Sequence, residues 1–266
     1  MKNFFQIGFY VLILVFLVIV IFFVNAFYGN PISKILANNA VKKYVAENFK
    51  GMDLKLEKAF YNFKDGRYHV RVGKEASEDI NFVIETNYKG EVVYDNYESE
   101  VLSGFNTWRR LADEYRKLGD TVLLDENFPY ESDISYTILN MYEKNEPYGI
   151  KMSELELDKE YDIKELGRKY GEVVIYLYDE DVSVKKASEM MLGVKKLLDD
   201  GCVPFKTMDF NLSLPKEEGK PRNFDIYIGI ENFLYEEIYE EGLEERIEKA
   251  DKELKEYYKE LDKTKR

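Results

Sequence analysis

The chain has 266 residues, of which 45% are apolar and 33% are charged, a composition typical of a folded protein rather than of a disordered one. Its formal net charge is -13. Neither half is basic, since residues 1–150 carry 17 Lys+Arg against 21 Asp+Glu and the remaining residues carry 21 against 30. The basic surface typical of proteins that bind nucleic acid or anionic lipid is therefore missing, and we expect no nucleic-acid partner.

The single cysteine limits the chemistry further. Because Cys202 is alone, the chain has no intrachain disulfide, no CxxC redox pair and no thiolate-rich zinc site. We interpret Cys202 as a small, half-buried hydrophobic residue beside Gly201.

An apolar segment opens the chain. Ile7–Val24 is a run of 18 residues without a polar side chain other than the Tyr10 hydroxyl. At about 1.5 Å per helical residue, this run and its aromatic flanks cross a hydrocarbon core of about 30 Å. We therefore predict a single transmembrane anchor over residues 1–28, with the lipid bilayer as the partner of Ile7–Val24. Three aromatic residues are predicted to lie at the membrane interfaces: Tyr10, Phe27 and Tyr28.

A cleaved signal peptide is the alternative interpretation of this segment, because Val24-Asn25-Ala26 resembles a small-residue cleavage site. The apolar core exceeds the roughly 7–15 residues usual for a signal peptide, and only Lys2 precedes it. Both features favour a retained anchor in the cell membrane.

Charge gives the orientation of this anchor less directly. Lys2 lies on one side of it and Lys34, Lys42 and Lys43 lie on the other, so a count of nearby positive charges favours a cytoplasmic body. Long domains are translocated largely regardless of charge, however, and a short N-terminal tail is easily left inside. We therefore expect the body of the protein to be extracytoplasmic.

A helix and a small antiparallel sheet are predicted after the anchor. Pro31 suits the first turn of a helix, and apolar residues recur at three- and four-residue spacing until about Gly51. Strands are then indicated by two-residue alternation and by the turns Lys64–Gly66 and Lys89–Gly90. The expected strands are Leu54–Phe63, Arg67–Val72, Ile80–Glu85 and Glu91–Asp95. A further helix, with an apolar stripe from Val101 to Tyr115, is expected to cover this meander.

Strands and helices alternate in the second half. The expected elements are a strand at Ile134–Leu139, a helix at Asp158–Tyr170, a buried strand at Gly171–Tyr178, a helix at Ser183–Leu198 and a hairpin of Phe205–Leu214 with Phe224–Ile230. Gly201 is predicted to provide the left-handed cap of the second helix. This order of elements suggests a ferredoxin-like two-layer sandwich.

A densely charged helix is predicted from Glu231 to the C-terminus. Its apolar residues between Leu243 and Leu261 follow a heptad spacing over fewer than three heptads, which is too short to predict a coiled coil. Packing of this helix back on the second domain is the favoured interpretation, and self-association through it is the alternative.

Several motifs together resemble the YfjL-like family of membrane-anchored proteins of Gram-positive bacteria. They are Gly29-Asn30-Pro31 with its helix, Tyr61–Gly66, Val93–Ser99 and Phe128–Ile134. The resemblance covers nearly the whole chain and implies an N-terminal anchor followed by two small α+β domains, the first similar to cystatin or PepSY modules. It brings no catalytic residues. The expected segments are 1–28 (anchor), 29–125 (first domain), 126–232 (second domain) and 233–266 (charged helix).

The best sign of an enzyme is Asp179-Glu180-Asp181, directly after the buried strand. Two carboxylates at a strand end can share Mg²⁺, as phosphoryl and glycosyl transfer require. The other interpretation, which we favour, is an acidic turn in which Asp181 or Ser183 caps the next helix.

Two weaker motifs lack the other residues that their chemistry would require. Ser183–Lys186 matches SxxK, but the KTG and SDN motifs that accompany it in penicillin-binding proteins are absent from the sequence. His69 is the only histidine, so we predict a surface or rim residue and neither a histidine-based metal cluster nor a catalytic triad.

The favoured function is a membrane-tethered, non-enzymatic binding or regulatory protein. Sheet edges or the tail helix would be presented to an extracytoplasmic peptide, protein or wall component. We assign no catalytic, cofactor-binding or metal-binding residue and expect no cofactor. The alternative is a Mg²⁺-dependent phosphoryl or glycosyl transfer enzyme that uses Asp179 and Asp181.

Overall fold

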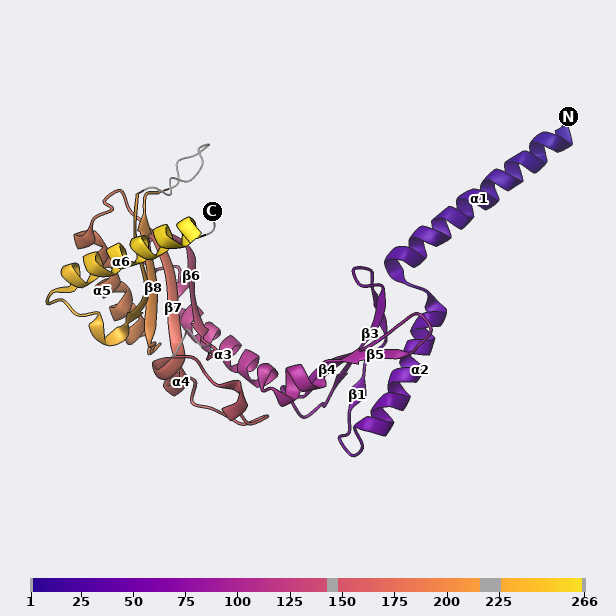
Figure 1. Cartoon of the computed structure of the whole chain (residues 1–266), viewed down its shortest axis with the longest axis horizontal. Coiled ribbons are helices and arrows are strands. Elements are labelled where there is room, and N and C mark those ends of the chain that lie inside the picture. The colour runs from indigo at the N-terminus through magenta and orange to yellow at the C-terminus, as the bar shows by residue number, and fades with distance from the viewer. Residues whose placement is uncertain (1, 143–147, 216–225, 265–266) are drawn as a thin grey trace. The chain divides into compact units, whose positions relative to one another are not determined.

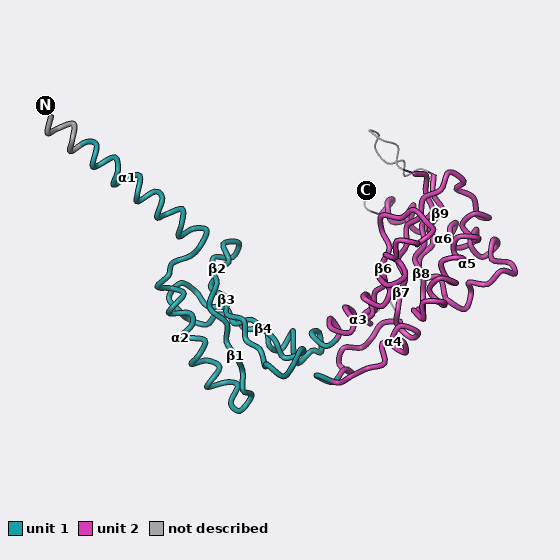
Figure 2. Tube along the Cα trace, turned by 180° about the vertical axis from the view of Figure 1, so that it is seen from behind, with its two compact units in different colours: residues 1–107, 156–158 teal, residues 108–155, 159–266 magenta. Residues whose placement is uncertain are grey.

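A computed structural model of the chain describes residues 2–142, 148–215 and 226–264 (Figure 1). It divides into two compact units: unit 1 contains residues 1–107 and 156–158, and unit 2 contains residues 108–155 and 159–266 (Figure 2). The predicted class is confirmed, because a long apolar helix, an antiparallel sheet, a mixed sheet with helices and a C-terminal helix follow one another. The expected segment limits at residues 28, 125 and 232 stay predictions.

The apolar segment forms helix α1, Lys2–Tyr28, and is followed by helix α2, Pro31–Asn48, at the predicted place. Gly29 separates the two helices with a φ of +73°, and it lies so close to Tyr61 that an added Cβ would be 2.5 Å from the Tyr61 Cβ. Asn30 caps α2, because its side chain accepts the N–H of Ile32 at 2.8 Å, and its own N–H donates to the hydroxyl of Tyr68 at 2.8 Å. The junction between the helices is therefore bound to the sheet of unit 1.

The sheet of unit 1 is antiparallel, with the order β1-β3-β4-β5 and with β2 also paired to β3. Its strands are β1 Lys55–Leu56, β2 Phe60–Asn62, β3 Arg67–Gly73, β4 Asn81–Thr86 and β5 Val92–Asp95. The alternating residues Tyr68, Val70 and Val72 are buried and pack with Ala37 and Val41 of α2. One face of the sheet is thus covered by α2.

The first expected strand is wrong in one respect, because two short strands replace it. The N–H of Ala59 donates to the side chain of Asn38 on α2 at 2.9 Å, which takes the chain away from β3 between β1 and β2. The interruption is therefore caused by a contact with α2.

Helix α3, Phe105–Leu123, follows a single π-helical turn at Glu98–Leu102. The boundary between the units falls inside α3, after Thr107. From Trp108 onward α3 packs in unit 2, since Leu111 and Tyr115 are buried with Leu139 and Ile150. The expectation that this helix covers the first sheet is therefore wrong beyond its first turn.

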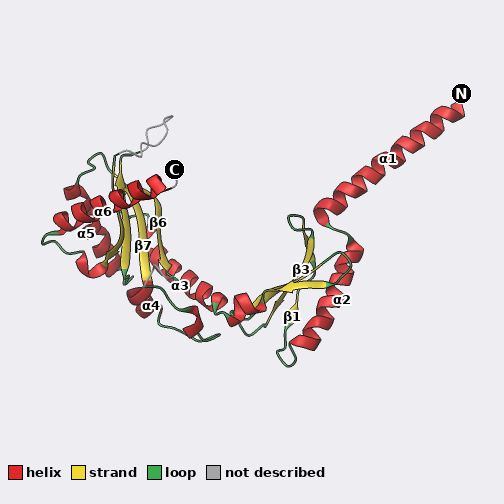
Figure 3. Ribbon diagram, viewed as in Figure 1, coloured by secondary structure: helices red, strands yellow, loops and turns green. Residues whose placement is uncertain are grey.

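The sheet of unit 2 is mixed, with its strands in chain order, β6-β7-β8-β9 (Figure 3). Strands β7 and β8 are parallel and the other two pairs are antiparallel. The strands are β6 Ser132–Leu139, β7 Gly171–Tyr178, β8 Thr207–Ser213 and β9 Tyr227–Leu234, with helix α4 Ile163–Tyr170 before β7 and helix α5 Val184–Asp200 between β7 and β8. The ferredoxin-like connectivity is wrong, because α5 joins two adjacent strands, whereas a split βαβ unit leaves room for a strand between them.

The core of unit 2 lies between this sheet and α5. Val173, Ile175 and Leu177 alternate on β7, are fully buried and pack in one cluster with Met191 and Val194 of α5. Their two-residue spacing on the strand explains why β7 was predicted with its observed limits.

The end of α5 differs from the prediction at one residue. Gly201 has a φ of -77°, and the left-handed position belongs to Cys202, with a φ of +55°. Gly201 is needed for a different reason, because an added Cβ would collide with the side chain of Val122 on α3. Glycine here allows the close approach of two helices.

The C-terminal helix α6, Leu243–Thr264, begins later than predicted, because β9 continues to Leu234. Leu243 and Ile247 are fully buried in the core of unit 2, which confirms that the helix packs back on the second domain. Further along α6, Asp251 accepts the N–H of Gly229 at 3.0 Å and Lys255 donates to the carbonyl of Tyr227 at 2.9 Å. Helix α6 therefore also binds the outer edge of β9.

Candidate functional site

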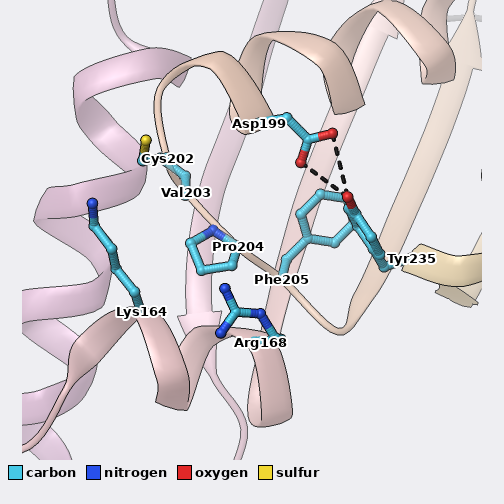
Figure 4. A pocket seen from close by; sticks show the side chains of 8 residues that line it. All are labelled: Lys164, Arg168, Asp199, Cys202, Val203, Pro204, Phe205 and Tyr235. Atoms are coloured by element: carbon cyan, nitrogen blue, oxygen red, sulfur yellow. Dashed lines mark hydrogen bonds between the residues drawn. The ribbon is translucent and has the colours of Figure 1, made fainter.

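A pocket of about 420 Å³ opens in unit 2 beside α4 (Figure 4). Four segments line it: α4, the end of α5, the loop that leads to β8 and the residue after β9. The lining residues are Lys164, Arg168, Asp199, Cys202, Val203, Pro204, Phe205 and Tyr235. We call it the α4 pocket.

Two cationic side chains stand on one side of the α4 pocket. Lys164 and Arg168 are one turn apart on α4, and Figure 4 shows the Arg168 side chain pointing toward Pro204. Asp162 begins this helix by accepting the N–H groups of Lys164 and Glu165 at 2.9 and 3.1 Å. Neither cation forms an ion pair with any residue that the structure describes. The pocket thus combines two cations with one carboxylate, that of Asp199, in a chain that is strongly acidic overall.

The opposite side of the α4 pocket is fixed by hydrogen bonds. The hydroxyl of Tyr235 lies 3.2 and 3.3 Å from the two carboxylate oxygens of Asp199. Lys195 lies 3.9 Å from the centre of the Tyr235 ring and donates to the carbonyl groups of Tyr235 and Ile238 at 3.1 and 2.7 Å. Burial and then the Asp199 carboxylate raise the pKa of Tyr235, so its hydroxyl stays protonated at neutral pH.

The arrangement suits binding of an anionic group. Val203 and Phe205 provide a buried apolar floor, and the cations of α4 stand beside it. A carboxylate or phosphate attached to an apolar body would match both features.

Cys202 is exposed, which corrects the expectation of a half-buried residue. None of the described lining residues is a histidine, so the pocket offers Cys202 no imidazole base.

Asp179 and Asp181 lie together in the turn before α5, where the hydrogen bonds of Asp179 explain its position. Asp179 accepts the N–H of Asp181 at 2.9 Å with one carboxylate oxygen, and its other oxygen lies 2.9 Å from the Lys186 ammonium. These two contacts hold the pKa of Asp179 below its usual value. The Oγ of Ser183 accepts the N–H of Lys186 at 3.2 Å and caps α5. The SxxK match is thus a helix cap, and Lys186 occupies the side of Asp179 where a cation would bind.

Comparison with known protein families assigns both parts of the chain. The model described as "YfjL-like, N-terminal domain" matches residues 4–96, and the one described as "YfjL-like C-terminal domain" matches residues 114–248. The chain belongs to the YfjL-like family. The resemblance inferred from the sequence is therefore confirmed, and the α4 pocket lies wholly within the YfjL-like C-terminal domain. No curated protein and no solved structure matches the chain.

In the YfjL-like N-terminal domain, His69 lies between two carboxylates. The ligand atoms of Asp65, His69 and Glu85 lie within 4.8 Å of one another, which is close enough to share an ion. His69 Nε2 lies 3.0 Å from Asp65, and Nδ1 lies 4.0 Å from Glu85. Arg67 also holds both carboxylates, since its guanidinium lies 2.5 Å from Glu85 and its N–H donates to Asp65 at 2.9 Å. These contacts explain the cluster without an ion, and the expectation of no metal site stays a prediction.

A second cavity of the YfjL-like C-terminal domain, about 220 Å³ in volume, contains Asp209, a carboxyl group whose pKa is strongly raised. It lies between the sheet and α6. Burial and then the neighbouring Glu172 carboxylate raise the pKa of Asp209 to about 7, although the N–H of Asn232 donates to Asp209 at 2.7 Å. Ionised Asp209 is therefore a source of instability.

Replacing Asp209 with asparagine is expected to stabilise the protein at pH 8 and to have little effect at pH 4. The pKa of Asp209 is higher in the folded state than the ordinary 3.8, so the folded state keeps this proton at pH values where the unfolded state has lost it. The free energy of unfolding therefore falls as the pH rises from about 4 to about 7. We expect a gain on the order of 2 kcal/mol at pH 8. This is less than the roughly 4 kcal/mol that three pKa units represent, because Asp209 is only partly buried and water screens its charge.

Chemical denaturation between pH 4 and pH 8 measures this gain, with the exposed carboxylate of Asp200 as the control in Asp200→Asn. An Asp209→Asn protein whose stability runs parallel to that of the wild type across this range would contradict the assignment.

Proposed function

We propose that this protein is a single-pass, membrane-tethered binding protein without catalytic activity. Helix α1 anchors it in the cell membrane, the two YfjL-like domains face the extracytoplasmic side, and the α4 pocket binds an anionic group of a peptide or protein partner. Asp179 and Asp181 are assigned to the turn before α5, a helix that Ser183 caps, instead of to Mg²⁺-dependent catalysis.

The observation that carries the proposal is the exposure of α1. The candidate membrane span within residues 8–48 has a mean hydropathy of 3.0 in its most apolar window, and none of that window is buried. Side chains such as Leu12 and Phe22 are each 68% exposed. In water this surface would be strongly unfavourable, whereas a bilayer solvates it. The cleavage-like sequence Val24-Asn25-Ala26 lies inside the continuous helix, which supports a retained anchor.

Cys202 makes the orientation directly testable. It is the only cysteine, and it is exposed at the rim of the α4 pocket. A membrane-impermeant maleimide should label Cys202 in intact cells as completely as it does after lysis. Labelling that requires lysis would place the domains in the cytoplasm and overturn this part of the proposal.

The same thiol allows a test of partner binding. A photo-crosslinker attached to Cys202 in cells should give a discrete adduct, and the double substitution Lys164→Glu, Arg168→Glu should abolish it. Hydrogen bonds to charged groups contribute about 1.5–3 kcal/mol each, so reversing both charges should weaken binding by at least ~100-fold. The matched control is Lys185→Glu, Lys196→Glu, which makes the same change in net charge at exposed positions of α5.

Two outcomes would contradict the binding role of the α4 pocket. One is an adduct that survives reversal of both charges, and the other is an adduct that the control removes equally. Thermal melting of each variant shows that loss of the adduct does not follow from unfolding.

A further inference from the structure

We infer that the end of unit 1 from which α1 emerges rests in the interfacial layer of the membrane, on a rim of exposed apolar side chains. This inference rests on the proposed function, because it needs α1 to span the bilayer. We call this surface the interfacial rim. Its residues come from the end of α1, the first turns of α2, the β2–β3 turn and the β4–β5 turn: Phe27, Tyr28, Ile32, Ile35, Phe63 and Tyr88.

The strand register brings these segments to one end of the sheet. Asn62 pairs with Arg67 across the β2–β3 turn, and Tyr68 pairs with Thr86 just before the β4–β5 turn. The N–H of Asn30, between α1 and α2, donates to the hydroxyl of Tyr68 at this same end. Leu36 of α2 also lies against Gly90 of the β4–β5 turn. Three loops and the start of α2 therefore surround the point where α1 leaves the domain.

Helix α1 is held to this end by packing as well as by the chain. The rings of Phe27 and Phe63 are 6.0 Å apart, and Figure 2 shows β2 beside the place where α1 leads into α2. Gly29 lies against Tyr61 with no room for a side chain. The end of α1 and the β2–β3 turn therefore stay at the same depth relative to a membrane that α1 crosses.

The exposure of the rim is too large for a surface in water. Each of its six side chains is more than half exposed: Phe27 55%, Tyr28 71%, Ile32 67%, Ile35 61%, Phe63 58% and Tyr88 64%. The rim directly continues the apolar surface of α1. Contiguous exposed apolar surface of this kind marks an interaction site, and continuity with a membrane span identifies the lipid interface as the occupant.

The polar residues around the rim fit the same occupant. Lys34, Lys64 and Lys89 lie on three of the rim segments, and none of them forms an ion pair with a described residue. Lysine places its stem along apolar surface and its ammonium among headgroups, and tyrosine is favoured at the interface for a similar reason. The nearby acidic groups are already engaged, since Asp65 contacts His69 and Glu91 accepts the side chain of Asn87 at 2.6 Å.

Depth measurements on the full chain in phosphatidylcholine nanodiscs test the inference. In a Cys202→Ser background, spin labels are placed singly at Phe63→Cys and Tyr88→Cys. Leu17→Cys in α1 reports the membrane span, and Ala76→Cys reports the opposite end of the sheet, where Ala76 is exposed. All four positions are exposed, and melting temperatures check that each labelled protein is folded.

The quantity measured is the ratio of each label's accessibility to oxygen to its accessibility to a water-soluble nickel complex. We expect this ratio at Phe63 and Tyr88 to be higher than at Ala76 and closer to the ratio at Leu17. If the ratio at Leu17 is that of a label in lipid but the ratios at Phe63 and Tyr88 equal the ratio at Ala76, the inference is overturned, while the proposal that α1 is a membrane anchor is not. If Leu17 is itself in water, the proposed function fails. Spin–spin broadening at Phe63 or Tyr88 with protection from both reagents would assign the rim to a second copy of the chain and would also overturn the inference.

Discussion

Replacing Gly167 with alanine is expected to destabilise unit 2 by about 2 kcal/mol, although alanine is the better helix former by up to ~1 kcal/mol. Gly167 lies in α4, and an added Cβ would be 2.5 Å from the ring of Tyr115 and 2.6 Å from the carbonyl oxygen of Pro204. Neither neighbour can move cheaply. Tyr115 is fully buried, its hydroxyl donates to the same Pro204 carbonyl at 2.8 Å, and Pro204 belongs to the loop of the α4 pocket.

Two costs should therefore exceed the gain in helix propensity. Overfilling a packed core costs about 1–3 kcal/mol. Separating Tyr115 from Pro204 leaves a partly buried carbonyl without its donor, which costs a further ~1 kcal/mol. Urea unfolding of the full chain in detergent, followed by tyrosine fluorescence, measures the difference.

Gly193→Ala is the matched control for this substitution, because Gly193 is also inside a helix, α5. Its added Cβ would collide with the hydroxyl of Tyr130, which is the free end of a half-buried side chain that can rotate away. We expect a change within about 1 kcal/mol, since the propensity gain offsets the movement. Equal losses in the two variants, or a stable Gly167→Ala protein, would refute the distinction between a fixed and a movable neighbour.

The double substitution Val15→Arg, Val18→Arg is expected to release the protein from the membrane. Both residues lie near the middle of α1. An arginine at the centre of a spanning helix costs about 2.5–3.5 kcal/mol on insertion, so two should lower the equilibrium constant for insertion by more than ~1,000-fold. The measurement is the fraction of protein that remains with membranes after an alkaline wash.

A control pair, Asn39→Arg with Asn48→Arg, adds the same number of arginines at exposed positions of α2 and should leave the protein in the membrane. A Val15→Arg, Val18→Arg protein that stays with the washed membranes would contradict the anchor. So would a wild-type protein whose N-terminus begins at Phe27, since that would identify α1 as a cleaved signal sequence.

Most helices and strands could be predicted because their burial follows their sequence period. In β7 the buried residues Val173, Ile175 and Leu177 alternate along the strand, and in α2 the buried residues Ala37, Val41 and Val45 recur every fourth residue. Such local signals do not report which strands become neighbours. The parallel pairing of β7 with β8 was therefore missed.

The contacts that shape the sites depend on residues far apart in the sequence. The split between β1 and β2 follows from Asn38, and the α4 pocket joins Arg168 to Tyr235. No spacing rule connects such residues. The His69 cluster could have been found, because both strands of the β3–β4 hairpin were predicted and His69 pairs directly with Glu85 in its register. Pairing the two predicted strands residue by residue would have shown this.

The side chains of Asp251 and Lys255 have a consequence for how a partner can bind. They take up the outward N–H of Gly229 and the outward carbonyl of Tyr227, which are groups that an incoming strand would use. A peptide, or another copy of the protein, would have to break both of these bonds to add a strand at this part of β9. Helix α6 thus protects an aggregation-prone edge, and it restricts recognition on this side of the domain to side chains.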